Sequence, residues 1–300
     1  MTYFIFFCLF VIGLAIGSFM NVLILRYKPE GNFFDIHDIS GRSKCMSCGK
    51  TLPAKELVPL FSFLFLRGTC SSCGEKISIQ YPIVELLGGA VFVLIPLFFN
   101  SFFGIRHAIF ASLMAPGWYY PFLFLWILAF LILILIFVID LRHYIIPDGL
   151  NFSLFVVGIA TTVLFVANKT DFLMFRESFF KNYALVFSPF QNILYNHALG
   201  FLAGGLFFLF LFLVSRGRGM GMGDIKLAFA SGMLLGWPDV ILTTILAFIF
   251  GGMWAAVLYI SKKKTMKDRL PFGPFFVVAF AITVFFGFDL VRAYFLLFNL

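Results

Sequence analysis

The chain has 300 residues, of which 62% are hydrophobic and only 12% are charged. Soluble domains carry about 25% charged residues, so this composition, with a mean hydropathy of +1.02, excludes an ordinary soluble protein. The apolar runs are long and continuous rather than alternating, which argues against a β-barrel. They predict an all-α polytopic membrane protein, the other fold that satisfies backbone polar groups in lipid.

Eight apolar segments are long enough, or nearly so, to cross a bilayer as helices. The first has no basic residue before it and no small-residue cleavage site, so we expect a membrane helix rather than a cleaved signal peptide. The sixth is short and ends at Gly236-Trp237-Pro238, so we expect a partial or tilted span. The predicted spans are 3–25, 81–99, 120–139, 150–167, 197–214, 224–237, 239–260 and 272–296.

The net charge of +8 is concentrated in alternate loops. The loops at 26–80, 141–149, 215–223 and 261–271 hold 16 Lys and Arg residues, whereas 100–119 and 168–196 hold four. The positive-inside rule therefore places the first set in the cytosol and the N-terminus on the opposite side, which would be the periplasm if the membrane is a bacterial inner membrane. Because the basic residues sit in several loops beside lipid, we interpret the charge as a signal of topology and predict no nucleic-acid partner.

The loop at 26–80 is the largest polar segment and carries two CxxC pairs, each followed by glycine. Two thiolates on one tight turn can reach the same ion, and two such turns give the tetrahedral S₄ shell that structural zinc prefers. The alternatives are two disulfides or redox-active pairs, which a reducing cytosol disfavours. The predicted zinc ligands are Cys45, Cys48, Cys70 and Cys73. We therefore expect three parts: a helix at 1–25, a cytosolic zinc domain at 26–80 and a membrane domain at 81–300.

Three aspartates are predicted at the cytosolic ends of spans. Asp148 has a structural explanation, because it would cap the helix that it opens. Asp140 would face the negative end of a helix dipole, and Asp224 follows a flexible glycine segment. Ionisable groups at such positions indicate a functional site rather than a purely structural role. Two adjacent carboxylates can share one proton, so that one activates water while the other hydrogen-bonds a scissile carbonyl, as in aspartic proteases.

Glycines alternate with methionines just before Asp224, in the segment GMGMGD at 219–224. Without a Cβ, Gly221 and Gly223 allow close approach of another backbone and can adopt positive φ. We expect them to contact an extended substrate strand beside Asp224. The alternative is a flexible loop with no other role.

These motifs together resemble the bacterial type IV prepilin peptidases, whose GxGD signature marks intramembrane aspartyl proteases. The matching features, in chain order, are GSFMNV at 17–22 with Arg26, the paired CxxC loop, YPIVE at 81–85, Asp140 seven residues before Pro147-Asp148, GMGDIKLA at 221–228 and PFGP at 271–274. They extend over nearly the whole chain.

The resemblance implies an enzyme of the cytoplasmic (inner) membrane with two activities. Its peptidase would remove the leader of prepilins and pseudopilins on the cytosolic face, just after a glycine, with Asp140 and Asp224 as catalytic residues. Its methyltransferase would then methylate the new N-terminal amine with S-adenosylmethionine. The resemblance names no ligands for the methyl donor; Glu85 and residues 17–26 are candidates, with helix packing as the alternative. The segments 100–119 and 168–196 are longer than the family pattern leads us to expect.

Three other functions remain open at this point. A transporter or ion-path protein would use Asp140, Asp224 and Glu85 as a path for ions or protons, and would spread carboxylates across the membrane. A scaffold would use the zinc loop to bind a partner without chemistry. A peptidase that has lost methylation would differ only in its product.

Overall fold

The structure, a computed structural model, describes residues 2–29, 41–102, 117–168, 178–187, 192–263, 265 and 268–297. Throughout these residues the fold is helical, with two isolated β-bridges as the only pairing of extended strands, which confirms the predicted fold class. The chain divides into two compact units, residues 1–117 and 118–300. The predicted boundary between a cytosolic domain and a membrane domain at residue 81 stays a prediction.

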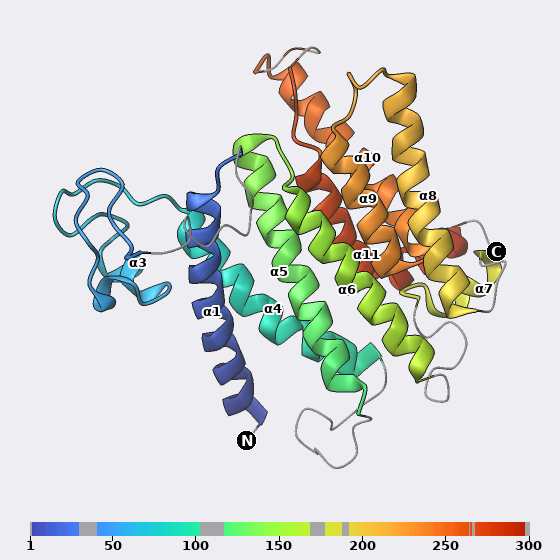
Figure 1. The fold of residues 1–300 in the computed structure, drawn as a ribbon, viewed down its shortest axis with the longest axis horizontal. Helices are drawn as coiled ribbons and strands as arrows, with labels where there is room; N and C mark the ends of the chain where they lie inside the picture. Colours follow the sequence, from blue (N-terminus) through green and yellow to red (C-terminus); the bar gives the residue numbers. More distant parts are fainter. Residues whose placement is uncertain are drawn as a thin grey trace. The chain divides into compact units, whose positions relative to one another are not determined.

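The first unit contains two long helices and the loop that joins them (Figure 1). Helix α1 (Thr2–Arg26) packs along α4 (Gln80–Phe102), and the loop carries the short elements η1 (Ala54–Glu56) and α3 (Phe61–Phe65). Gly13 and Gly17 on α1 make the close approach possible. A Cβ at Gly13 would lie 2.5 Å from the carbonyl oxygen of Gly88, and one at Gly17 would lie 2.7 Å from the Cα of Glu85.

The second unit is a ring of six helices, each packed against the next. Around the ring the order is α8, α9, α6, α5, α11, α10 and back to α8. Two short elements, η2 (Lys181–Tyr183) and α7 (Ala184–Phe187), precede α8. The ring helices are α5 (Tyr119–His143), α6 (Asp148–Ala167), α8 (Ile193–Val214), α9 (Met222–Leu235), α10 (Asp239–Ile260) and α11 (Gly273–Leu297).

Seven helices in the described residues are long and apolar enough to span a membrane, against the eight predicted spans. The difference is α9, which has only 14 residues because the chain turns at Gly236 with φ +77°. The Trp237 N–H donates to the Asn196 carbonyl, so α9 ends beside the start of α8. The short sixth segment is therefore a helix that runs antiparallel to α8 without reaching its full length.

Glycines fix the register of α8 against α9. A Cβ at Gly200 would lie 2.6 Å from the carbonyl oxygen of Gly232, and one at Gly204 would lie 2.9 Å from that of Ala228. In this antiparallel register Asp224 lies level with Phe208. Helix α8 consequently extends four residues, about 6 Å, beyond the first residue of α9.

The two long segments at 100–119 and 168–196 fall partly outside the described residues, which leave out 103–116 in the first and 169–177 and 188–191 in the second. In the second of them, residues 178–187 pack against the ring: Phe180 and Ala184 form an apolar cluster with Val291 of α11. The Phe179 N–H donates to the Asp239 carboxylate, at the start of α10, over 2.9 Å. This part of the segment is therefore a structural part of the second unit.

Candidate active site and metal site

Asp140 lies in the last turn of α5 and is 4% exposed. The helix ends when Tyr144 adopts a left-handed conformation, φ +56°, and its N–H donates to the Asp140 carbonyl. The Asp140 side chain accepts a hydrogen bond from the Gly273 N–H, the first residue of α11, over 3.0 Å. The carboxylate is thus held between α5 and the start of α11.

Asp224 lies in the first turn of α9, where its Oδ2 accepts the Gly221 N–H over 3.1 Å. A carboxylate in this position reaches back to the cap residue and suits the helix dipole, which gives Asp224 a structural role. It does not account for the second feature, which is that the charge of Asp140 acts on Asp224. Two carboxylates from elements more than 80 residues apart in sequence therefore interact at one end of the ring.

The glycines beside Asp224 bring the backbone close to the segment that leads into α6. A Cβ at Gly223 would lie 3.0 Å from the Cβ of Ile146. One at Gly221 would lie 3.2 Å from the Asp224 Oδ2. The nearest neighbours of both glycines are side chains of the protein itself, and contact with a substrate strand stays a prediction. Neither glycine has a positive φ; in this loop that conformation falls on Arg216 and Gly217.

Helix α6 contributes two contacts to this site that sequence reasoning did not identify. Asn151, 3% exposed, donates its side-chain amide to the Gly223 carbonyl over 3.2 Å. Its own Oδ1 is buried and has no hydrogen-bond partner among the residues that the structure describes. Lys226 forms an ion pair of 2.7 Å with Asp148. Both contacts hold the start of α9 against the start of α6.

The expectation that Asp148 caps α6 needs correction. The residue at the cap position is Pro147, and it makes no side-chain cap hydrogen bond. Asp148 is the first residue of the helix, and its carboxylate pairs with Lys226 instead. A lone Asp after proline gave no signal of this, because its partner lies 78 residues away.

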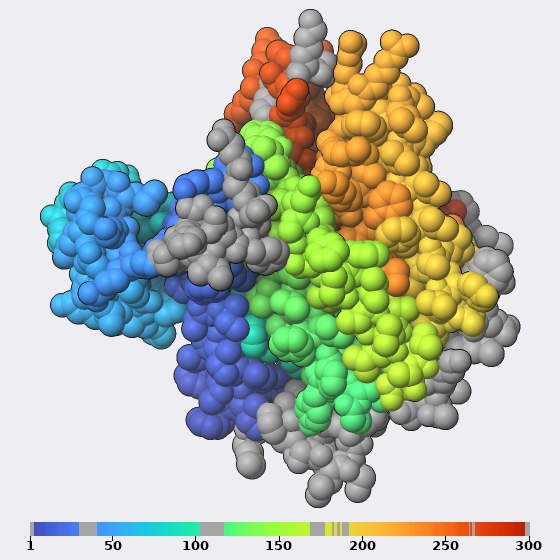
Figure 2. Space-filling model, in the orientation of Figure 1, coloured from blue at the N-terminus to red at the C-terminus, as the bar shows by residue number. Residues whose placement is uncertain are grey.

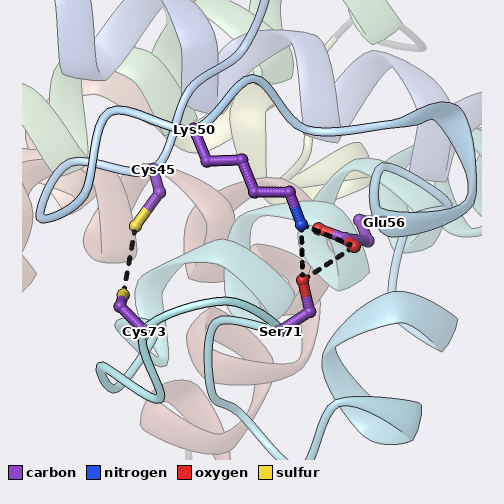
Figure 3. A network of polar contacts seen from close by, with 5 residues as sticks. All are labelled: Cys45, Lys50, Glu56, Ser71 and Cys73. Atoms are coloured by element: carbon purple, nitrogen blue, oxygen red, sulfur yellow. Dashed lines mark hydrogen bonds and ion pairs between the residues drawn. The ribbon is translucent and has the colours of Figure 1, made fainter.

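The four predicted metal ligands come together in the first unit. The sulfur atoms of Cys45, Cys48, Cys70 and Cys73 all lie within 4.8 Å of one another, and none forms a disulfide. Figure 3 shows Cys45 and Cys73 facing each other, with their sulfurs 3.9 Å apart. A tetrahedral ion with bonds of about 2.3 Å separates its sulfur ligands by about 3.8 Å, so this cluster fits metal binding.

The two CxxC turns have the same geometry. In the first turn the Cys45 carbonyl accepts the Gly49 N–H, and the Cys45 N–H donates to the Lys50 carbonyl. In the second turn Cys70 makes the same two hydrogen bonds with Gly74 and Glu75. Gly49 and Gly74 have φ of +72° and +70°, which explains why glycine follows each pair. Isolated bridges close the turns, Lys44 to Thr51 and Thr69 to Lys76.

Polar contacts join the two turns beside the sulfurs (Figure 3). Lys50 donates to the Ser71 hydroxyl over 3.2 Å, and Ser71 donates to the Glu56 carboxylate over 2.8 Å. Backbone N–H groups of Cys48 and Ser47 lower the pKa of Cys45 to about 6. A lowered pKa favours the thiolate, the form that binds metal, at Cys45, whereas hydrogen bonding to Cys70 and burial raise the pKa of Cys73.

Glu85 of α4 faces the loop of the first unit. Its Oε2 accepts the Leu60 N–H over 2.8 Å, and the Ser18 side chain also hydrogen-bonds it. Together with the approach of Gly17 to its Cα, these contacts account for Glu85 by packing and by attachment of the loop.

Two descriptions of protein families match separate parts of the chain. The description "Bacterial Peptidase A24 N-terminal domain" matches residues 11–99, and "Type IV leader peptidase family" matches residues 127–256. No solved structure matches the chain significantly.

Relatives named "Prepilin leader peptidase/N-methyltransferase" match much of the chain. The relative from Klebsiella pneumoniae is 33% identical over 80% of this chain and 89% of its own length. The relative from Stutzerimonas stutzeri is 28% identical over 96% of this chain and 92% of its own length. The relative from Myxococcus xanthus is 38% identical over 51% of this chain and 38% of its own length. The chain therefore belongs to the prepilin leader peptidase/N-methyltransferase family of A24 aspartic peptidases.

Proposed function

We propose that this chain cleaves the leader peptide from type IV prepilins and pseudopilins, just after a glycine, with Asp140 and Asp224 as the catalytic pair. The observation that carries the proposal is that these two carboxylates lie near enough at one end of the ring for the charge of Asp140 to act on Asp224. Each is already oriented by a backbone N–H, from Gly273 and Gly221 respectively. One carboxylate takes a proton from water, and the other donates a hydrogen bond to the scissile carbonyl.

The active site faces the cytosol in this proposal. The loops beside it are the basic ones, at 141–149, 215–223 and 261–271, and the positive-inside rule assigns basic loops to the cytosol. A prepilin leader is on that face before cleavage. Gly221 and Gly223 then lie where an extended leader would have to pass to reach Asp224.

The second proposed activity is methylation of the new N-terminal amine by S-adenosylmethionine. Its support is the N-methyltransferase activity in the names of the relatives. The cysteine cluster has a separate, structural role in the proposal, which is to hold one zinc ion that joins the two CxxC turns. The four thiolates saturate such an ion and leave no open position for chemistry.

The test is co-expression with a prepilin that carries a basic leader, a glycine and a phenylalanine, followed by intact mass of the product. We expect loss of the leader and a gain of one methyl group. Asp140→Asn and Asp224→Asn should each leave the precursor whole, with cleavage reduced by about 10⁴-fold, as for loss of a central catalytic group. Asp289→Asn, a change in α11 away from the pair, should cleave normally.

Each outcome separates the parts of the proposal. Normal cleavage by either Asn variant would remove the two-aspartate mechanism. Cleavage without added mass would keep the peptidase and remove the methyltransferase.

A further inference from the structure

The loop of the first unit contains an apolar segment, residues 57–66, with the sequence LVPLFSFLFL. Its only polar side chain is that of Ser62, and none of the residues of α3 within it is buried. Five large side chains are exposed: Leu57 41%, Val58 44%, Phe61 56%, Leu64 69% and Phe65 83%. Single exposed apolar residues are ordinary, but five within nine positions form the kind of patch that marks an interaction surface.

The segment is attached to a membrane helix rather than extending freely from the loop. The Leu60 N–H donates to the Glu85 carboxylate over 2.8 Å. Glu85 is the sixth residue of α4, a candidate span, so it lies about 7.5 Å along the helix from Gln80. Figure 1 shows α3 level with the body of α1, not beyond its end. The exposed side chains therefore start at the depth of the first turns of a membrane helix.

The backbone at this attachment is held in an uncommon conformation. Leu60 has φ +60° and ψ −50°, which costs energy for any residue with a side chain. Such a conformation persists only where neighbouring contacts enforce it. Here Glu85 provides the contact, and Ser18 of α1 in turn hydrogen-bonds Glu85. The position of the segment against the α1–α4 pair is thus fixed by the fold.

Charged residues flank the segment but do not enter it. Lys55 lies before it and Arg67 after it, and both are exposed. Long basic side chains beside exposed aromatic and aliphatic residues are typical of chains that lie in a membrane interface, with the charges at the phosphates of anionic lipids. In the space-filling view the loop forms a lobe of its own beside the helices of its unit (Figure 2). The exposed side chains of the segment therefore lie on the surface of this lobe.

We propose that residues 57–66 lie in the boundary between headgroups and acyl chains of the bilayer and bind phospholipid directly. Phe61, Leu64 and Phe65 enter the acyl region, and Lys55 and Arg67 contact anionic headgroups. The metal cluster is then fixed to the membrane surface at a second point besides α1 and α4. Binding of a second copy of the chain or of a protein partner would not explain why the segment is attached to α4 at Glu85, more than one turn from the start of that helix.

Photocrosslinking in the full-length protein tests this inference. Phe65 is replaced by p-benzoylphenylalanine, and the protein is reconstituted in vesicles of phosphatidylethanolamine and phosphatidylglycerol, irradiated and analysed by mass spectrometry. The matched control is the same replacement at Met46, which is 80% exposed in the same loop. The reference for lipid contact is Phe124, 64% exposed on α5. Prepilin cleavage by each variant verifies that the protein is folded.

We expect phospholipid adducts at Phe65 with a yield close to that at Phe124 and about ten times that at Met46. The same replacement at Leu64 should give the same result, which guards against a fold defect at one position. The proposal is overturned if Phe65 and Leu64 give no more lipid adduct than Met46 while Phe124 is labelled. Adducts to a second copy or to the prepilin in place of lipid would also overturn it.

Discussion

Gly273 lies with its backbone against Asp140, and a Cβ there would be 2.7 Å from the Asp140 Oδ2. Gly273→Ala should therefore displace the carboxylate while keeping the N–H that it accepts. We expect kcat for prepilin cleavage to fall by about 10²-fold, the usual effect of a misplacement near 1 Å. The matched control is Gly252→Ala in α10, whose added Cβ would meet no heavy atom within 4 Å among the described residues. Wild-type cleavage by Gly273→Ala would show that Asp140 is not constrained at this point.

Asn151 offers a separation of activity from stability. Asn151→Leu keeps the shape of the side chain, removes the donor to the Gly223 carbonyl and also removes the buried Oδ1. Removing the buried Oδ1 that has no partner offsets the loss of the one hydrogen bond to Gly223, so we expect the melting temperature to change by less than about 3 °C. Cleavage should fall by about tenfold or more, because the start of α9 loses a contact that positions Asp224. Equal losses of stability and activity would instead indicate a purely structural role.

At the scale of helices, glycine determines the contact between α8 and α9. A Cβ at Gly232 would lie 2.2 Å from the carbonyl oxygen of Gly200, so Gly232→Ala forces the helices apart. We expect a loss of about 1–3 kcal/mol in the free energy of unfolding. Gly251→Ala is the comparison, because its Cβ would meet Phe275 at an ordinary 3.5 Å. Thermal unfolding of both variants in the same detergent gives the result, and equal melting temperatures would contradict this contact.

Long apolar runs, and the glycine and proline residues that interrupt helices, allowed most of the membrane helices to be predicted from sequence. Continuous apolar runs located the seven spans, and Gly236-Trp237-Pro238 indicated that the sixth segment is short. The register of α8 against α9 could not be predicted, because it depends on which glycines meet. The contacts of Asp140 with Gly273 and of Asn151 with Gly223 span 133 and 72 residues. No local spacing reports such contacts, whereas the repeated CxxC spacing was sufficient to predict the cysteine cluster.

At the scale of the whole molecule, the metal should stabilise the loop of the first unit and leave the ring of helices intact. Removal by a chelator, or the pair Cys48→Ser and Cys73→Ser, should accelerate amide hydrogen exchange at 44–51 and 69–76 by about 100-fold or more, because metal binding supplies much of the folding free energy of such a small domain. Exchange in α5 and α9 should stay unchanged. Cys8→Ser, in α1, serves as the control that retains the metal. Unchanged exchange in the two turns after metal loss would contradict a structural role for the ion.

The segment that connects α8 to α9 is longer than the distance between the two helix ends requires. Residues 215–221 connect Val214 to Met222, and an extended segment of that length could span about 23 Å. It has to descend only about 6 Å along α8 and cross about 8–10 Å to the neighbouring axis. In Figure 1 the chain indeed turns back from the end of α8 before α9 begins. The glycine-rich connection is therefore longer than the gap that it crosses, and the surplus length is taken up by a turn in which Gly217 and Arg218 donate their N–H groups to the carbonyls of Phe212 and Ser215.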